Sequence, residues 1–243
     1  MIVPEKHKIV PGSGREPMKI PVLTFLIDHP KGLVLVDTGL NPSVWPDEIK
    51  NEGTTNPDLS VEISLDNIGY SPNDIDYVVM SHLHMDHTGW MTAFPNATFI
   101  LRLEELKWAW WPDNRNPGAG GYVFNDYKST RNFIYIELLD DQDYDIFGDG
   151  TLICIDTKGH TRGHQSLIIN LPEAGCYVLA IDAAIVEENY RNRTPPGEEI
   201  WNLEWALRAY DRFNLLEKKG AKIIYGHDPV QSRNLKYSPR FYK

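Results

Sequence analysis

Short runs of apolar residues alternate with polar turns along the chain and predict strands in two groups. In the first half, residues 22–27 and 33–36 are apolar runs joined by His29-Pro30-Lys31-Gly32, so we expect a hairpin there. Residues 75–80 and 98–101 predict two further strands. In the second half, the runs that predict successive strands are residues 152–155, 166–170 and 176–180.

Helical spacing of apolar residues occurs in three segments. Residues 61–69 predict a short helix that stops at Gly69, and residues 104–110 predict a second helix. The longest predicted helix ends at Lys218-Lys219-Gly220 and has apolar residues at Leu203, Ala206, Leu207, Tyr210 and Phe213. Strands come first and a helix later in each half, so we expect an α/β protein with an αββα sandwich.

Four candidate metal ligands stand within six positions, one residue after the apolar run 77–80. They are His82, His84, Asp86 and His87, in the pattern His-x-His-x-Asp-His. A regular helix or strand cannot direct four such side chains to one point, whereas a tight loop after a strand can. Metal binding is the usual reason for such a loop, so the pattern predicts a metal site.

Further candidate ligands stand at the ends of other strand-like runs. His160 lies within residues 158–164, Asp182 follows the run 177–181, and His227 follows residues 222–226. Another motif, Val36-Asp37-Thr38-Gly39, precedes them all. With these motifs in this order, the sequence resembles the metallo-β-lactamase superfamily over about residues 20 to 230.

The resemblance implies the αββα fold with two adjacent divalent metal ions at the edge that the two sheets share. The implied ligands are His82, His84 and His160 for the first ion, Asp86, His87 and His227 for the second, and Asp182 as a bridge between them. Imidazole nitrogens and carboxylates suit zinc, and iron, manganese and cobalt are the alternatives. Neither cysteine is among the ligands, which argues against a structural zinc finger.

The implied chemistry is hydrolysis. An open position on each ion is typical of catalytic sites rather than structural ones. Two ions about 3.5–4 Å apart can share a bridging hydroxide, which would attack an ester-like carbonyl. Asp86 is the candidate for passing a proton to the leaving alkoxide, and the bridging Asp182 is the second catalytic candidate.

Four other residues near the motifs have weaker assignments. His164 is expected to orient ligands or strands rather than to bind metal. Asp37 either hydrogen-bonds a ligand histidine or its loop, or is an ordinary turn aspartate. His7 and His29 stand in polar or turn contexts and are expected at the surface.

Stretches outside the metal motif are similar to the N-acyl homoserine lactonase branch of the superfamily, namely residues 18–22, 159–167, 181–184 and 225–228. This resemblance implies that a lactone ring is opened to a hydroxy acid, and that the chain forms a homodimer. The branch typically has a tyrosine three residues after the bridging aspartate, whose hydroxyl helps to bind the carbonyl. Ile185 stands there instead, and Tyr190 either supplies that hydroxyl or only packs.

Other enzyme classes on this fold remain as alternatives. A glyoxalase-II-like thioesterase or a phosphodiesterase uses nearly the same ligands but lacks the Gly-His-Gln-Ser context of residues 163–166. A flavodiiron oxidoreductase would have glutamate at the position of His84, and a binding protein would have lost ligands. Residues 114–127 are either a lid or an ordinary loop. Trp108, Trp110 and Trp111 either line an acyl pocket or pack the helix.

Composition agrees with one enzyme domain spanning residues 1–243, since 42% of the 243 residues are hydrophobic. The net charge of −10 disfavours a nucleic-acid partner and gives no reason to expect a membrane partner.

No signal peptide or apolar run of membrane-spanning length is evident, so we expect a cytoplasmic protein. Cys154 and Cys176 lie in strand-like runs and are expected to be free thiols. Residues 140–143 are expected to form a solvated acidic turn.

Overall fold

Two five-stranded sheets lie face to face in the computed structural model, which describes residues 2–3, 5–44, 60–112, 121–196 and 200–243. In the first sheet, a β3–β4 hairpin is followed by three strands that run parallel to β4. In sheet order, its strands are β3 (Phe25–His29), β4 (Gly32–Val36), β5 (Tyr77–Val79), β6 (Thr98–Arg102) and β7 (Ile134–Leu138).

The second sheet is antiparallel apart from its last pair, β11 and β12, which run parallel. Its strands are β8 (Tyr144–Asp145), β9 (Leu152–Asp156), β10 (Gln165–Leu171), β11 (Gly175–Ile181) and β12 (Lys222–Tyr225). A separate small ribbon pairs β1 (Ile2–Val3) with β2 (Met18–Lys19).

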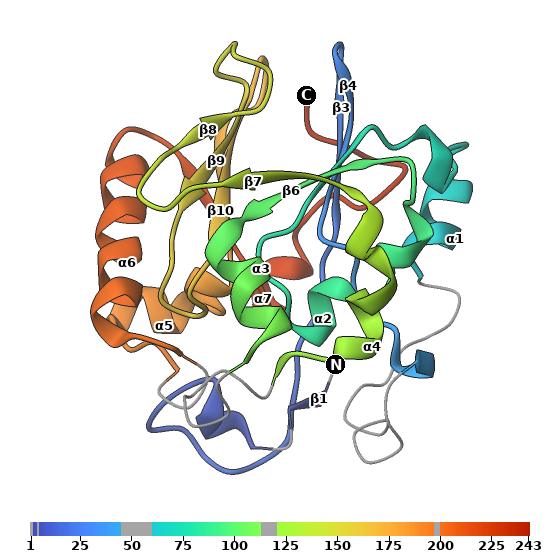
Figure 1. Cartoon of the computed structure of the whole chain (residues 1–243). Helices are drawn as coiled ribbons and strands as arrows, with labels where there is room; N and C mark the ends of the chain where they lie inside the picture. Colours follow the sequence, from blue (N-terminus) through green and yellow to red (C-terminus); the bar gives the residue numbers. More distant parts are fainter. Residues whose placement is uncertain (1, 4, 45–59, 113–120, 197–199) are drawn as a thin grey trace.

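Helices cover the outer face of each sheet, and Figure 1 shows α6 on one side of the molecule and α1 on the other. The α-helices are α1 (Val61–Asp66), α2 (Met85–Thr88), α3 (Leu103–Trp110), α4 (Phe124–Tyr127), α5 (Glu187–Asn192), α6 (Leu203–Lys218) and α7 (Pro229–Ser232). Short 3-10 helices occupy Lys6–Lys8, Pro42–Val44, Pro72–Asp74, Met91–Ala93, Lys128–Asn132 and Asp182–Ala184.

Strand alternation explains the four layers. In β4, Val34 and Val36 join the core between the two sheets, whereas Leu35 joins the core under α1, α3 and α4. The second sheet divides in the same way, because Leu179 belongs to the central core and Val178 packs towards α5 and α6. Successive side chains of a strand point to opposite faces, so a strand buried on both sides is continuously apolar. The predicted αββα sandwich is confirmed.

Helix α6 illustrates both the success and the limit of sequence periodicity. The predicted end is confirmed: the helix stops at Lys218, and Gly220 adopts a φ of +96°. Its start is fixed by Asn202, whose side chain accepts a hydrogen bond from the Trp205 amide. Leu203 belongs to the helix as predicted, but apolar spacing does not report its burial, because this first residue of the helix is 54% exposed.

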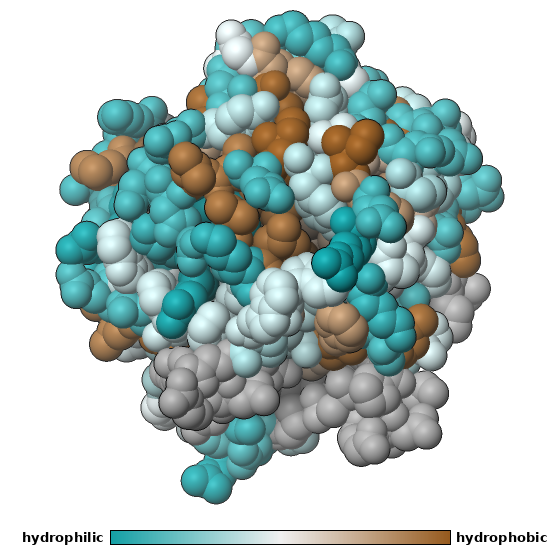
Figure 2. Space-filling view, viewed as in Figure 1, coloured by the Kyte–Doolittle hydropathy of each residue, from teal (hydrophilic) through white to brown (hydrophobic). Residues whose placement is uncertain are grey.

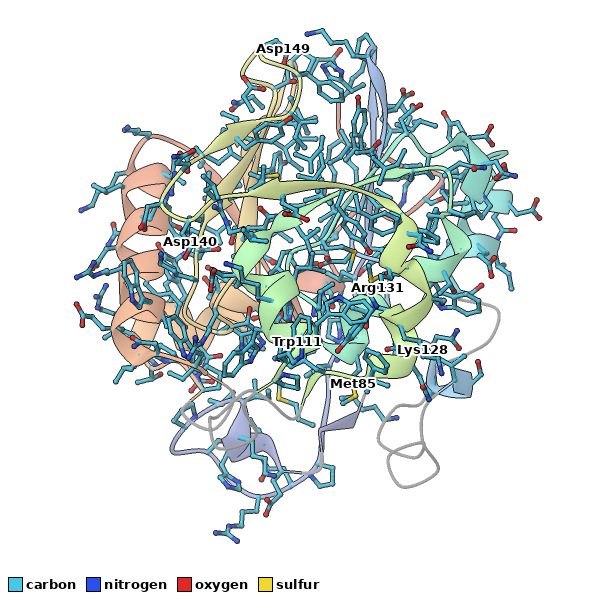
Figure 3. All side chains as sticks on the ribbon, viewed as in Figure 1. Met85, Trp111, Lys128, Arg131, Asp140 and Asp149 are labelled. Carbon is cyan, nitrogen blue, oxygen red and sulfur yellow. The ribbon has the colours of Figure 1, made fainter. Side chains whose placement is uncertain are left out.

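The loops that follow β4, β5, β9, β11 and β12 meet at one end of the sandwich. Figure 3 labels Met85, the first residue of α2, at that end, and Asp149 at the opposite end. In Figure 2 the viewed face is largely polar at its flanks, with an apolar band between them. None of the helices in the described ranges has the length and apolarity needed to cross a membrane.

Candidate metal centre

The candidate ligands of the sequence come together at the loop end of the sandwich. Residues after β5 supply four of them, and the loops after β9, β11 and β12 supply one each. All seven side chains belong to buried residues, with exposures between 0 and 7%. Each of them lies in at least one of three groups whose ligand atoms are within 4.8 Å of one another, and His82 and His87 each belong to two.

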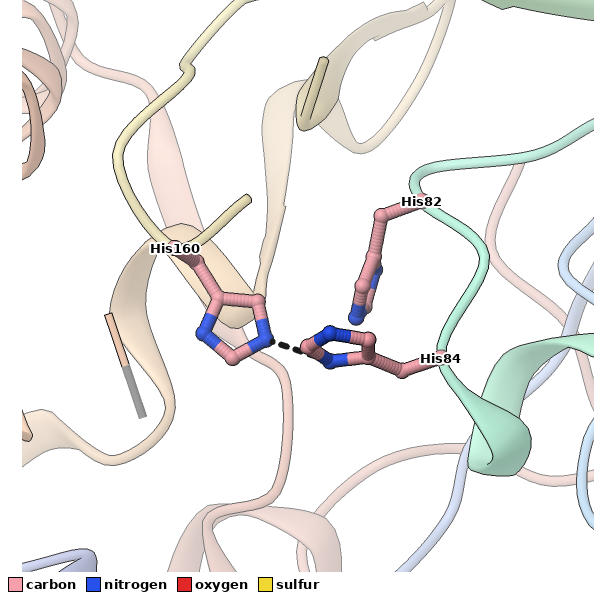
Figure 4. Close-up of side chains that lie close together, drawn as sticks. All are labelled: His82, His84 and His160. Carbon is pink, nitrogen blue, oxygen red and sulfur yellow. Dashed lines mark hydrogen bonds between the residues drawn. The ribbon is translucent and has the colours of Figure 1, made fainter. Parts of the chain in front are cut away.

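The first group is His82, His84 and His160 (Figure 4). Nε2 of His160 lies 3.0 Å from Nδ1 of His84, and the ring of His82 stands beside both, with its centroid 4.7 Å from that of His84. The group joins the two halves of the molecule, because His82 and His84 follow β5 of the first sheet and His160 follows β9 of the second.

The second group is Asp86, His87 and His227. The Asp86 carboxylate lies between the two imidazoles, with Oδ1 3.7 Å from Nε2 of His87 and Oδ2 3.4 Å from Nε2 of His227. This group also draws on both sheets, since His227 follows β12.

Asp182 lies between the two groups. Its Oδ2 atom faces the first group, 3.4 Å from Nε2 of His160 and 3.9 Å from Nε2 of His82. Its Oδ1 atom faces the second group, 2.9 Å from Nε2 of His227 and 3.4 Å from Nε2 of His87. A carboxylate in this arrangement can contact two cations at once, one through each oxygen.

The buried donor atoms fit divalent metal ions. Nε2 of His82, His87 and His227 and Oδ1 of Asp182 are buried, and none of them makes a hydrogen bond of normal geometry to a described residue, although Oδ1 lies 2.9 Å from Nε2 of His227. Leaving such an atom unpaired typically costs about 1–3 kcal/mol, so a cluster of them indicates that another group normally satisfies them. Imidazole nitrogens and carboxylate oxygens in this number are the usual ligands of a dinuclear transition-metal site.

Neighbouring groups fix the outer nitrogen of three ligand histidines and so leave Nε2 free for the centre. Nδ1 of His87 donates to Asp37 (2.8 Å), and Nδ1 of His227 donates to the Pro21 carbonyl (2.7 Å). The Ser81 hydroxyl lies 3.0 Å from Nδ1 of His82 and donates to Asp37 (2.7 Å). Asp37 therefore holds the ligand loop, which decides between its two interpretations.

Electrostatics divides the ligand histidines into two kinds. Burial lowers the pKa of His82 and of His160 well below the usual value, so both rings are neutral and can act as metal ligands without losing a proton. Burial also acts to lower the pKa of His87, but Asp86, Asp37 and Asp182 outweigh it and raise that pKa well above the usual value. Metal binding at His87 must therefore displace a proton.

His164 lies outside the three groups, as expected. Its Nδ1 atom is 3.0 Å from the Thr157 hydroxyl, which in turn lies 2.8 Å from the Ser166 hydroxyl on β10. Burial lowers the pKa of His164 to about 3, so the ring is neutral. It ties the start of the 157–164 loop to the sheet.

Position 185, three residues after Asp182, is an isoleucine where the N-acyl homoserine lactonase branch typically has a tyrosine. Ile185 is 2% exposed and packs in an apolar cluster with Ile9, Val10 and Ile20. Tyr190 does not replace the missing hydroxyl, because its own hydroxyl donates to Glu217 of α6 at 3.2 Å. Tyr190 is a packing aromatic.

Two of the three tryptophans considered for an acyl pocket, Trp108 and Trp110, pack in the fold, whereas Trp111, directly after α3, does not. Trp108 is 9% exposed and lies under the guanidinium of Arg162, whose Cζ is 4.1 Å from the ring centroid. Trp110 packs against Phe124, and Trp111 is 79% exposed. Residues 114–120, which are half of the segment considered as a lid, lie outside the described residues.

Several expectations away from the centre are also tested. His29 is not a plain surface residue, because its ring stacks on Phe147 with centroids 3.9 Å apart. The acidic turn is exposed at residues 141–143, as expected, and its Asp141 also pairs with Nζ of Lys158 at 3.0 Å. Both cysteines are free, as expected, and Cys154 is buried.

Sequence reasoning missed Glu105 and Gly121. Glu105 is fully buried and contacts the loops that carry His82, His84 and His160. Gly121 lies against His84, because a Cβ atom there would come within 2.5 Å of that ring. Glu105 is one of two adjacent glutamates at the start of α3, so nothing local in the sequence distinguished it.

Comparisons with known proteins agree with this geometry. The model of the metallo-beta-lactamase superfamily matches residues 19–227. The N-acyl homoserine lactonase AttM of Rhizobium radiobacter is 34% identical over an alignment of 251 positions, gaps included, which covers 97% of this chain and 92% of that protein. An N-acyl homoserine lactonase of Bacillus cereus is 31% identical over 235 residues, which cover 92% of this chain and 88% of that protein.

Solved structures give the same result. An N-acyl homoserine lactone hydrolase with the product N-hexanoyl-L-homoserine bound at its catalytic metal centre is 25% identical, with a TM-score of 0.83, over 99% of this chain and 94% of that one. A mutant of AiiA of B. thuringiensis with N-decanoyl-L-homoserine bound at the active site has a TM-score of 0.84 at 25% identity, over 99% of this chain and 95% of that one. From the matched family model and these relatives, the chain belongs to the metallo-beta-lactamase superfamily.

Proposed function

We propose that this protein is a metal-dependent hydrolase that opens the lactone ring of N-acyl homoserine lactones and so acts in quorum quenching. The observation that carries the proposal is Asp182, whose two oxygens face two separate groups of metal-ligating side chains. The named activity of the relatives supports it, because they match nearly the whole chain and not the metal motif alone.

The proposed ligands are those named from the sequence. The first ion would be held by His82, His84 and His160, the second by Asp86, His87 and His227, and both by Asp182. When bound, two such ions activate water and polarise the scissile carbonyl. Zinc is the proposed metal because it favours imidazole and carboxylate ligands, and iron, manganese and cobalt are the competitors that a metal analysis distinguishes.

Asp86 and Asp182 are the proposed catalytic residues. Ring opening leaves an alkoxide, which must gain a proton before it departs as the hydroxyl of the product. Asp86 is the only carboxylate of the second group, so it is the residue that we propose to pass this proton to the alkoxide. Asp182 keeps both groups at the separation that the reaction needs.

The deciding experiment compares substrates on metal-reconstituted protein. We expect the highest kcat/KM on N-acyl homoserine lactones, tested with short and long acyl chains beside simple γ-lactones. S-lactoylglutathione and a phosphodiester represent the thioesterase and phosphodiesterase alternatives. If either has a higher kcat/KM than every lactone, the lactonase proposal is replaced by that activity.

Three further predictions from the sequence are part of this proposal. They are a homodimer, a single hydrolase domain over residues 1–243 and a cytoplasmic location. Light scattering at several protein concentrations measures the first, limited proteolysis measures the second, and cell fractionation measures the third.

A further inference from the structure

Glu105 is a buried carboxylate with an unusual set of partners. It stands in the first turn of α3, directly after β6, and its residue is 0% exposed. Its four hydrogen-bond donors are all neutral groups. Burying a carboxylate is costly unless its oxygens are well satisfied, so a fully buried glutamate on neutral donors indicates a specific role.

The four donors come from three loops at the metal centre. Oε1 accepts from the Leu83 amide and from the Tyr122 hydroxyl, both at 2.9 Å. Oε2 accepts from the Thr161 hydroxyl at 2.6 Å and from the Gly163 amide at 3.0 Å. One oxygen therefore holds the loop after β5, and the other holds the loop after β9.

The partners adjoin the first group of ligands and not the second. Leu83 stands between His82 and His84, and Thr161 directly follows His160. Tyr122 adds a third contact, because its ring lies edge-on to that of His84 with centroids 4.7 Å apart.

Helix α3 packs closely against the loop that carries His160. A Cβ atom at Gly163 would lie 2.2 Å from the Glu105 backbone nitrogen, so only glycine lets the loop approach this closely. One helical turn further on, Trp108 lies under the guanidinium of Arg162. Glu105 and Trp108 therefore fix consecutive residues of one loop from the same face of the helix.

We propose that Glu105 is the positioning residue of the first metal site, which sets the distance between the His82–His84 loop of one sheet and the His160 loop of the other. The inference rests on the proposed metal centre and adds a selectivity to it. Loss of Glu105 weakens metal binding by His82, His84 and His160, and leaves binding by Asp86, His87 and His227 unchanged.

The test measures zinc affinity at each site separately, by competition with a chromophoric chelator. His227→Ala disables the second group and isolates the first, whereas His84→Ala isolates the second. In the His227→Ala background, we expect Glu105→Gln to weaken zinc binding by about 10–100-fold. In the His84→Ala background, the same substitution should change the affinity less than about threefold.

The matched control is Glu104→Gln. Glu104 is the preceding residue of the same helical turn, and its carboxylate pairs with Lys107 at 2.7 Å on the surface, where the side chain is 39% exposed. This variant should leave both zinc affinities unchanged. If Glu105→Gln fails to fold, Thr161→Val removes one donor while keeping the shape of the side chain, and should weaken the first site about 3–10-fold.

The outcomes separate this inference from the proposed function. Equal weakening of both sites would show that Glu105 is only structural, and unchanged affinity at the first site would overturn the inference. In both cases the wild-type protein would still bind two zinc ions, so the proposed function would stand. A wild-type chain that binds no zinc would overturn the metal centre and, with it, the role of Glu105.

Discussion

At the scale of single residues, two aspartates stand on opposite sides of His87. Asp182 faces its Nε2 atom at 3.4 Å, whereas Asp37 accepts from its Nδ1 atom at 2.8 Å. We expect Asp182→Asn to reduce metal content and kcat/KM far more than Asp37→Asn, because it removes the negative charge between two cations. Changes to an outer partner such as Asp37 typically cost about 10–100-fold.

Zinc content per chain and kcat/KM on one lactone, measured for both variants at saturating zinc, check this order. Asp28→Asn is a suitable control, since this aspartate is exposed on β3. Equal losses in the two variants would show that Asp182 is not the bridge.

Tyr190 provides a second prediction at this scale. Its hydroxyl is directed to Glu217, and its ring packs against Tyr210 with centroids 5.5 Å apart. We therefore expect Tyr190→Phe to change kcat on N-acyl homoserine lactones by less than about threefold, whereas loss of a carbonyl-binding donor typically costs about 10²–10³-fold. Steady-state kinetics measures the difference. A tenfold or greater loss of kcat would show that the Tyr190 hydroxyl takes part in the reaction.

At the scale of secondary-structure elements, the N-terminus of α6 gives a stability prediction. The Asn202 side chain caps the helix through the Trp205 amide. Asn202→Ala should lower the free energy of unfolding by about 1 kcal/mol, the usual cost of a lost N-cap. Urea unfolding monitored by circular dichroism measures it, and Leu203→Ala, at an exposed position, should stay within about 0.5 kcal/mol of the wild type. A smaller loss at Asn202 than at Leu203 would contradict the capping role.

The elements also show what sequence pattern can and cannot predict. The pattern predicts strands β9, β10 and β11 and the end of helix α6 within one or two residues, because each buries a regular apolar face. It misses strand β7, which lies at the edge of its sheet, where Ile134 is 63% exposed and the pattern of burial is irregular. Edge strands are set by their single neighbour more than by their own periodicity.

The metal motif is visible in the sequence for a different reason. Its ligands are chemically distinctive and four of them stand close together, so spacing alone indicates the site. The role of Glu105 cannot be predicted from the sequence, because it depends on contacts with the loops after β5 and β9. These loops come from different sheets and meet only in the folded protein, next to α3. Ordinary residue types that act through long-range contacts leave no local signal.

At the scale of the whole molecule, the metal centre joins the two sheets. The loop after β5 and the short helix α2 supply four ligands from the first sheet, and the second sheet supplies His160, Asp182 and His227. A bound ion therefore links the two halves of the sandwich in the folded state and finds no such arrangement in the unfolded chain. Metal binding should accordingly stabilise the whole fold.

Metal removal tests this link. Each site occupied at a hundred times its Kd contributes about 2.7 kcal/mol, and for a chain of this size about 1 kcal/mol shifts Tm by roughly 2–4 °C. Chelation should therefore lower Tm by about 10–20 °C when both sites were filled, as measured by scanning calorimetry.

Added zinc should restore Tm, whereas magnesium, which prefers oxygen ligands, should not. Because His87 must lose its proton, the zinc-dependent part of the shift should shrink as the pH falls. An unchanged Tm after verified metal removal would show that the ligands do not tie the sheets together.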